Sequence, residues 1–466
     1  MTTNSRSEYT KDYFPLPGFI VLALGIWLWM VFYPGNMSVD SLYHYRQAIT
    51  GQYTDLQPPL VAAVIALVLH LGGNLGTLIL IQVLSGCFGF RYLAMNILVS
   101  FNLNKKLADY LSLLLLVVFL SPISPLAFYL VTLWKDTWYA ILNLWVCALF
   151  LQLFSKPIAS VSRTLAVCFG SAGLFAIAML TRHNAIVVLP FWAMILWVIL
   201  HEQRRHISFF FASILFCIAV REGVNYTQFR ILHVERTYSE QAVLAMDLVG
   251  MLVVEPALQN QLTYISQHLA EDYREKYVFG QEYSLLEIVD FPVRGEKNQD
   301  LVDEYYRAIQ SSPLIWASVK LTAFYELLRP DRSHYTYHAG MEKNKFGLKQ
   351  NTDFKEIRNQ YKQLAKLAIK HTPLRWVFGI GIVWITAGLL EFILACYLWF
   401  RYQNPKARFW AVLLTIPLSY CGSYLLATID VDFRYIYPAM LLIEVFSISI
   451  AMALWIRFLQ KRFSRI

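Results

Sequence analysis

The sequence predicts an all-α polytopic membrane protein with about ten transmembrane helices. Hydrophobic residues make up 57% of the chain and charged residues only 15%, a balance that excludes an ordinary soluble domain. The apolar residues gather in long stretches, and a hydrocarbon core about 30 Å thick requires roughly 17 to 25 of them per helix. These stretches lie near residues 16–33, 76–98, 107–121, 136–154, 164–181, 185–201, 207–222, 376–400, 408–426 and 435–458.

The distribution of Lys and Arg predicts that both termini are cytoplasmic, because cytoplasmic loops retain positive charge. With the N-terminus inside, the short outer loops hold four basic residues, Arg46, Lys135, Arg182 and Arg434. The basic residues on the inner side are Arg6, Lys11, Lys105, Lys106, Lys156, Arg163, Arg204, Arg205, Arg401, Lys406, Arg408, Arg457, Lys461, Arg462 and Arg465. This topology accounts for the net charge of +9 without a nucleic-acid partner and predicts contact with membrane lipids.

The hydrophilic segments divide the chain into three predicted parts. Residues 1–222 form an N-terminal transmembrane module whose first outer loop covers residues 34–75. In that loop the apolar run 58–71 is too short to span a bilayer, so we expect an interfacial or re-entrant helix. Residues 223–373 form a mostly helical outer domain, and residues 374–466 form a C-terminal transmembrane module.

The first outer loop carries an acid in an informative position. Asp40 follows the first span by a few residues, and the loop continues through His44 to Gln57-Pro58-Pro59. A carboxylate at a partly desolvated membrane edge suits a general base, which takes a proton from an attacking hydroxyl group. The alternative is a structural acid in the first turn of a helix that begins near Ser38.

The order of these residues resembles the GT-C class of integral-membrane glycosyltransferases, which take a sugar from a polyisoprenyl-phosphate carrier on the outer face of the membrane. In that family an acid in the first outer loop acts as general base, and a His-Pro-Pro segment and interfacial helices follow it. Asp40 matches the acid, and residues 57–59 match the second element with Gln57 in place of His. The resemblance covers the layout of about the first 200 residues and includes the segments 180–185 and 434–438.

Basic residues on the outer side are the candidate ligands of the donor phosphate, because cationic groups stabilise a departing phosphate. Arg434 follows Asp430 and Asp432 at the start of the last span; the alternative is an ion pair with Asp432 or snorkelling to the interface. Lys135 and Asp136 begin the fourth span between two tryptophans. Lys135 is a phosphate candidate, whereas Asp136 either positions substrate or is an ordinary acid at a helix N-terminus.

Three more candidates for donor binding come from other segments. Arg182 and His183 occupy the outer turn between the fifth and sixth spans, where a simple hairpin needs no charged cluster. Arg329 belongs to an aromatic and charged stretch of the outer domain, residues 324–338. Aromatic faces and arginine forks suit sugars and phosphates, although a solvated surface is the alternative. The predicted substrate-positioning residues are His44, Gln57, Asp136 and Tyr435.

The sequence predicts no required cofactor. Asp430 and Asp432 resemble the spaced aspartates that hold a divalent cation in soluble nucleotide-sugar enzymes, so they are weak metal candidates. A lipid monophosphate donor does not need the charge neutralisation that a pyrophosphate needs. All six cysteines fall inside predicted spans, which argues against a disulfide framework and a zinc site.

The resemblance implies the transfer of a monosaccharide from a polyprenyl-phosphate carrier to a cell-surface glycan or lipid-linked saccharide. A single well-placed acid without an obvious nucleophile partner favours inversion by direct displacement. The expected location of the protein is the bacterial inner membrane with the active site outside, because glycosylation of Asn36 in a secretory pathway would crowd Asp40. The expected partners are the lipid-linked donor, the acceptor and membrane lipids. The alternatives are a lipid-linked oligosaccharide polymerase or ligase, and a transporter or flippase; charges gathered at one face rather than at the midplane argue against the last.

Overall fold

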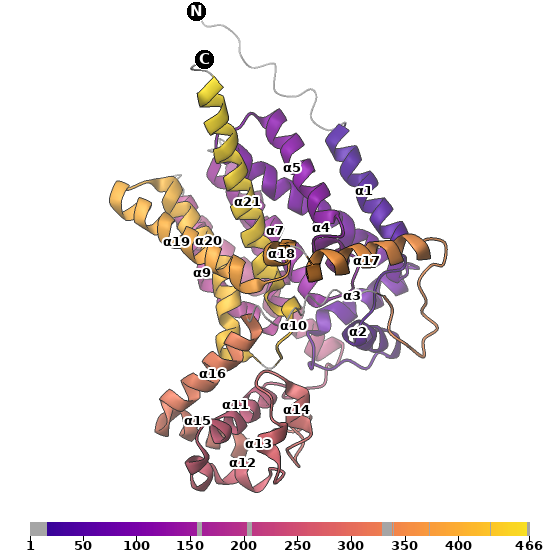
Figure 1. Cartoon of the computed structure of the whole chain (residues 1–466), viewed down its shortest axis with the longest axis vertical. Helices are drawn as coiled ribbons and strands as arrows, with labels where there is room; N and C mark the ends of the chain where they lie inside the picture. Colours follow the sequence, from indigo (N-terminus) through magenta and orange to yellow (C-terminus); the bar gives the residue numbers. More distant parts are fainter. Residues whose placement is uncertain are drawn as a thin grey trace, which may run out of the picture.

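The computed structural model describes residues 16–155, 161–202, 207–328, 338, 340–371, 373–428 and 430–463. Within these residues the regular secondary structure is helical, with only isolated β-bridges between loops, so the predicted all-α class is confirmed. Long helices form a bundle, and a smaller group of helices lies at one end of it (Figure 1). The long helices are α1 (Leu16–Phe32), α4 (Leu75–Ser100), α5 (Lys105–Leu120), α7 (Lys135–Ser155), α8 (Val161–Thr181), α9 (Leu189–Glu202), α10 (Ile207–Tyr226), α19 (Gly381–Tyr402), α20 (Pro405–Ala427) and α21 (Phe433–Phe463).

Among the described residues, eight helical segments are long and apolar enough to cross a membrane. These eight make the chain a candidate multi-pass membrane protein. The remaining two predicted spans correspond to α1, of 17 residues, and α5, of 16 residues. At 1.5 Å per residue each is about 25 Å long, shorter than a hydrocarbon core of about 30 Å. Both pack beside α4 within the bundle.

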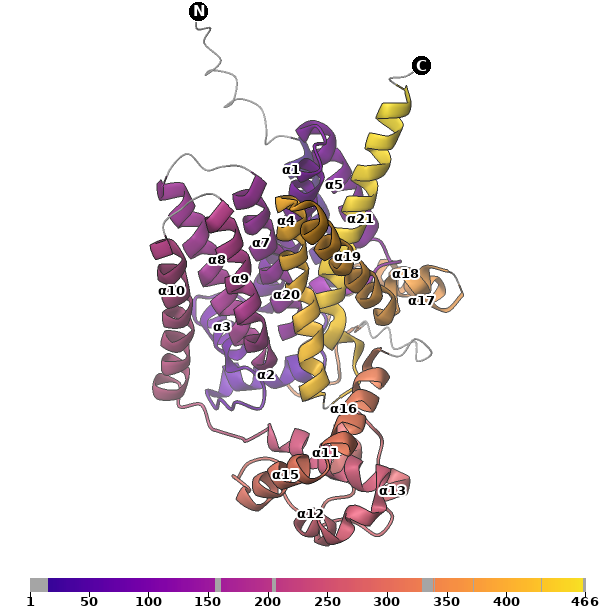
Figure 2. The same ribbon diagram turned by 90° about the vertical axis from the view of Figure 1, so that its left-hand side faces the viewer.

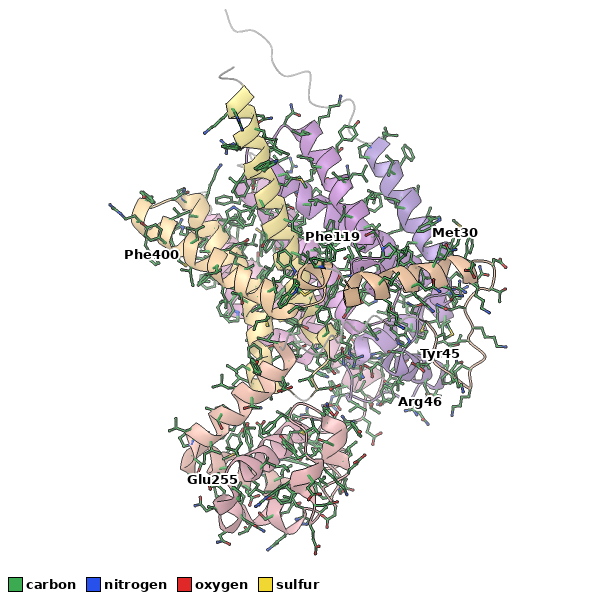
Figure 3. All side chains as sticks on the ribbon, in the orientation of Figure 1. Met30, Tyr45, Arg46, Phe119, Glu255 and Phe400 are labelled. Atoms are coloured by element: carbon green, nitrogen blue, oxygen red, sulfur yellow. The ribbon has the colours of Figure 1, made fainter. Side chains whose placement is uncertain are left out.

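The outer surfaces of the bundle are apolar. On α10, Phe211 and Leu215 are exposed, and on α19 so are Leu390 and Ile393. Such contiguous apolar surface is unfavourable in water and suits a lipid environment. Figure 3 shows Phe400, also exposed, at the far end of α19 away from the bundle centre.

Two helices of the first loop lie at the end of the bundle nearer the smaller helical group (Figure 1). They are α2 (Val39–Thr50) and α3 (Pro59–His70). Ser38 caps α2 in a capping box with Ser41, and Gly51 ends the helix with a left-handed φ of 68°, as glycine readily does. A proline at the first position begins α3, where its missing N–H costs nothing. The predicted helix of residues 58–71 therefore forms.

The smaller group, the α11–α16 cluster, has a hydrophobic core of its own. Its helices are α11 (Gln241–Val254), η3 (Pro256–Asn260), α12 (Thr263–Gln267), α13 (Tyr273–Lys276), α14 (Glu282–Leu286), α15 (Gln299–Ser311) and α16 (Pro313–Leu328). The last helix, α16, connects the cluster with the bundle (Figure 2). There Lys320 forms an ion pair of 2.6 Å with Asp247 and donates to the carbonyl oxygen of Leu426 at 2.7 Å.

The predicted outer region of residues 223–373 thus divides into segments with different surroundings. Its first residues continue α10 and form η2 (Thr227–Ile231), and the α11–α16 cluster follows. Its last helix, α17 (Lys355–His371), packs against α1 of the bundle rather than inside the cluster. A short helix, α18 (Leu374–Phe378), joins α17 to α19.

Candidate functional site

Asp40 and Arg434 meet at the end of the bundle that carries α2. Asp40 lies in the first turn of α2, and Arg434 is the second residue of α21. Nη1 of Arg434 donates to Oδ2 of Asp40 at 2.5 Å, although 394 positions separate the two residues. Nε of Arg434 also lies 2.8 Å from Oδ2 of Asp432. Arg434 therefore contacts both Asp40, the predicted base, and Asp432, the acid with which the alternative interpretation pairs it.

The charges around Asp40 keep it ionised. Burial raises the pKa of Asp40, but the positive charges of Arg434 and Lys135 outweigh burial and leave the pKa below its usual value of 3.8. One quarter of the Asp40 side chain remains exposed. Asp40 is thus an accessible carboxylate whose proton affinity depends on the position of Arg434.

His44 lies one helical turn after Asp40 and is buried. Burial and the charge of Lys135 lower the pKa of His44 to about 3, so the imidazole is neutral at physiological pH. Nearby, Nζ of Lys135 donates to Oε1 of Gln57 at 2.8 Å. The amide at position 57 therefore serves as a hydrogen-bond acceptor for Lys135.

Arg182 and Asp136 form a second ion pair, and both are buried, with 5% and 1% of each residue exposed. Arg182 also donates to the hydroxyl group of Tyr424. Because a carboxylate buried without a partner is costly, Asp136 has a structural reason to face Arg182. Asp136 is therefore a buried counter-ion of Arg182 and not a group open to substrate.

Tyr435 lies between the two arginines. The guanidinium carbon of Arg182 is 4.9 Å from the centre of the Tyr435 ring, and that of Arg434 is 5.1 Å from it. The Tyr435 ring also stacks on Tyr424 at 5.7 Å with an interplanar angle of 11°. Arg434 additionally lies over Trp134 at 5.5 Å. These contacts restrict both guanidinium groups.

A cavity of about 600 Å³ adjoins these residues. From the set predicted by sequence, its wall includes Lys135, Arg182, His183 and Tyr435. Asp40 and Arg434, although described, are not part of that wall. Two wall residues connect the cavity with the Asp40–Arg434 pair. The charge of Lys135 lowers the pKa of Asp40, and the ring of Tyr435 lies against the guanidinium group of Arg434.

No family model, curated protein or solved structure matches the chain.

The cavity wall is strongly basic, with five Lys and Arg side chains against two acids, Asp55 and Glu240. Two of the basic residues, Lys135 and Arg182, were predicted from the sequence. The other three are Arg221, Arg236 and Arg294. Each of the four arginines also has an acidic partner: Asp136 for Arg182, Glu222 for Arg221, Asp55 and Glu240 for Arg236, and Glu282 for Arg294. A phosphate or another multivalent anion in the cavity would compete with these acids for the arginine side chains.

Asp55 joins the first loop to residues 235–237, the segment that precedes α11. Its Oδ1 accepts hydrogen bonds from the backbone N–H and the hydroxyl group of Thr237, at 2.6 and 2.7 Å. Its backbone N–H donates to the carbonyl oxygen of Glu235 at 3.0 Å. Arg236 is thereby fixed at the cavity. Asp55 precedes Gln57 by two residues, and this proximity to the predicted Gln-Pro-Pro element was the signal that could have identified it.

Asp430 and Asp432, the weak metal candidates, lie close enough for the charge of one to act on the other. Asp430 pairs through its backbone with Gln281, and burial together with the charge of Asp432 raises its pKa to about 6. Among the described residues, no group of three or more His, Cys, Asp or Glu side chains is placed to hold a metal ion. Arg329 lies outside the described residues. All six cysteines are free, and five of them are buried.

Proposed function

We propose that the protein is a GT-C type membrane glycosyltransferase that transfers a monosaccharide from a polyprenyl-phosphate carrier to a cell-surface glycan or lipid-linked saccharide. The observation that carries the proposal is a basic cavity next to an ionised, partly exposed carboxylate, Asp40. The cavity supplies the charges that a lipid phosphate requires. The carboxylate supplies the acceptor of a proton.

The proposed topology has ten spans with cytoplasmic termini. Counting α1 and α5 as short spans gives an even number, so the start of α1 and the end of α21 fall on the same side. Figure 1 supports this, because both lie at the end of the bundle away from the α11–α16 cluster. Asp40, the cavity and the cluster then face outside. A bacterial inner membrane fits this arrangement, since the fully buried Asn36 leaves no room for a glycan.

The proposed reaction is a direct displacement that inverts the anomeric carbon. Asp40 takes the proton of the acceptor hydroxyl group as its oxygen forms a bond to the sugar carbon. The bond from that carbon to the phosphate oxygen breaks, and polyprenyl phosphate leaves with two negative charges. Lys135 and Arg182, on the cavity wall, offset the charge that develops.

Arg434 couples the two halves of this reaction. While it pairs with Asp40, the carboxylate is a weak base because its pKa is low. A phosphate that attracts Arg434 would weaken this pair and raise the proton affinity of Asp40. Donor binding would thus prepare the base.

The second candidate is a lipid-linked oligosaccharide polymerase or ligase that uses a diphosphate-linked donor. Arg221, Arg236 and Arg294 favour it, because they add three cations from α10 and the outer region to the same cavity.

The test compares donors and a single variant. Purified protein would be supplied with polyprenyl-monophosphate and polyprenyl-diphosphate sugars and with cell-envelope membranes as the acceptor source, and products would be identified by mass. We expect transfer from a monophosphate donor and a loss of about 10²-fold or more in Asp40→Asn. The matched control is Asp432→Asn, which removes the other acid on Arg434. Wild-type turnover by Asp40→Asn would remove Asp40 from the mechanism, and transfer from diphosphate donors alone would favour the polymerase or ligase.

A further inference from the structure

Helix α17 lies across the ends of two bundle helices. Nη1 of Arg358 donates to the carbonyl oxygen of Val31, in the last turn of α1, at 2.7 Å. The hydroxyl group of Tyr361 donates to the carbonyl oxygen of Leu120, the last residue of α5. Helix C-termini leave such carbonyl groups unpaired, so α17 supplies a donor to one of them at each end. In Figure 1 α17 runs across the bundle, and Met30 of α1 lies close to it in Figure 3.

This position fixes the level of α17 relative to a membrane. The two helices that it covers, α1 and α5, have 17 and 16 residues. They are the shortest of the ten proposed spans once α9 is counted with the preceding turn as the 20-residue segment His183–Glu202, and they would use their full length to cross the hydrocarbon core. Their ends therefore mark a membrane boundary. Because α17 hydrogen-bonds to both ends, it lies at that boundary.

The side chains of α17 fall on three faces. At 3.6 residues per turn, Arg358, Tyr361, Ala365 and Ala368 share one face, and all four are buried against the bundle. Beside it lies a second, exposed face that is mainly apolar. It carries Ile357, Leu364 and Leu367, with 37%, 54% and 54% of each residue exposed, and the polar Gln360 lies between them. The third face carries Lys355 and Lys366, which are exposed.

The helices in contact with α17 also expose apolar residues. On α1, Trp27 and Met30 are exposed, and in α18 Trp376 is 56% exposed. Tryptophan at this level is typical of the membrane interface. A helix with an apolar face, a basic face and tryptophan beside it is typical of segments that lie in the headgroup region of a bilayer.

We propose that α17 is an interfacial helix that inserts Ile357, Leu364 and Leu367 into the outer leaflet and binds acidic phospholipid headgroups through Lys355 and Lys366. Charge complementarity selects acidic phospholipids, because each Lys near an anionic surface contributes attraction. The inference depends on the membrane topology and not on sugar transfer.

The bound helix also supports the first loop. The segment that precedes it contacts the residues before Asp40: the backbone N–H of Met37 donates to Gly340 and that of Glu342 donates to Met37, both at 2.9 Å. Nε2 of Gln350 donates to Oδ1 of Asn36 at 2.7 Å. An α17 helix held by lipid therefore holds the chain that leads into α2.

The position of α17 can be measured with spin labels on the full-length protein in nanodiscs of phosphatidylcholine and phosphatidylglycerol. Nitroxides at positions 364 and 367 should collide more often with oxygen, which concentrates in lipid, than with a water-soluble nickel chelate. A label at the exposed position 366, on the basic face, should show the opposite preference, and unsubstituted protein gives the background from native cysteines. Equal behaviour at 366 and 364 would overturn the proposal. So would labels at 364 and 367 that neither reagent reaches, because a protein surface would then cover the face.

The headgroup preference is tested with the double variant Lys355→Gln/Lys366→Gln. Wild-type protein from mixed vesicles should retain phosphatidylglycerol several-fold over phosphatidylcholine in native mass spectrometry, and the variant should lose most of this enrichment. The matched control is Lys343→Gln/Lys345→Gln, which removes two exposed charges from the preceding segment. Wild-type enrichment in the first variant, or an equal loss in the control, would overturn the headgroup assignment. Neither readout requires turnover, so failure here is separate from failure of the proposed activity.

Discussion

Arg434 holds the carboxylate of Asp40 from almost the opposite end of the sequence, through a contact of 2.5 Å between Nη1 and Oδ2. The same guanidinium group lies beside Asp432 and over the ring of Tyr435. One cation therefore sets the charge of the candidate base and also lies next to a residue of the cavity wall. Its removal has consequences that differ from those of an ordinary surface ion pair.

The first prediction concerns the pH dependence of activity. Burial alone raises the pKa of Asp40, and Arg434 is the leading group that lowers it. Arg434→Gln should therefore raise this pKa. Because a general base acts when deprotonated, the acidic limb of the pH–rate profile should move to higher pH in the variant. The profile of donor turnover measures this shift. The control is Arg46→Gln, which changes an exposed arginine of α2, the helix that carries Asp40, and should leave the acidic limb in place. An unmoved limb in Arg434→Gln would contradict the coupling.

The second prediction concerns the buried pair of Arg182 and Asp136. Asp136→Asn leaves the buried guanidinium group without its counter-ion, which should lower the free energy of unfolding by about 3–5 kcal/mol. Thermal unfolding in detergent measures the loss. The control, Glu240→Gln, removes an exposed partner of Arg236 and should cost less than about 1 kcal/mol. Equal losses in the two variants would show that the buried pair contributes no more to the free energy of unfolding than the exposed pair does.

The sequence predicted those features that depend on local patterns. The apolar run near 76–98 corresponds to α4 and the run near 136–154 to α7, because hydropathy is a property of each segment. The distribution of Lys and Arg among the loops predicted that Lys135, Arg182 and Arg434 lie on the same side of the membrane. It could not specify that Arg434 would pair with Asp40, since that choice depends on how α2 packs beside α21.

The features that the sequence did not predict depend on tertiary packing. Arg236 and Arg294 lie in a region where many charged residues are solvated, and only the fold brings them to the cavity. The sequence predicted that residues 223–373 are mostly helical, and α17 is one of these helices. The sequence could not indicate which surface the helix covers, because an amphipathic pattern is the same on a soluble core and on a membrane bundle.

The third prediction concerns position 57, where the resemblance to the GT-C class expects His. Gln57 accepts a hydrogen bond from Lys135. A neutral His can accept the same bond through a ring nitrogen, so Gln57→His should retain donor binding. Gln57→Leu has a similar size and no acceptor, and should raise the KM for the donor about tenfold, corresponding to a lost hydrogen bond to a charged group of about 1.5 kcal/mol. An unchanged KM in Gln57→Leu would mean that Lys135 is positioned by other groups.

The fourth prediction concerns the ion pair that joins the α11–α16 cluster to the bundle. Lys320 and Asp247 are both buried, and burial raises the pKa of Asp247 while Lys320 opposes the rise. In Lys320→Met the opposing charge is absent, so the pKa of Asp247 in the folded state should rise further. A carboxyl group whose folded pKa is raised stabilises the fold below that pKa, and this contribution is lost as the pH rises through it.

Lys320→Met should therefore be closest to wild-type stability in mildly acidic solution and fall behind as the pH increases. Limited proteolysis across pH values measures this, because the cluster has its own core and should be cleaved before the bundle. The control is Lys276→Met, whose partner Asp272 is exposed, so its ion pair should add little at any pH. A cleavage rate that does not depend on pH in Lys320→Met would show that another group stabilises the Asp247 carboxylate. The hydroxyl group of Tyr305, which donates to Asp247 at 3.0 Å, is the candidate.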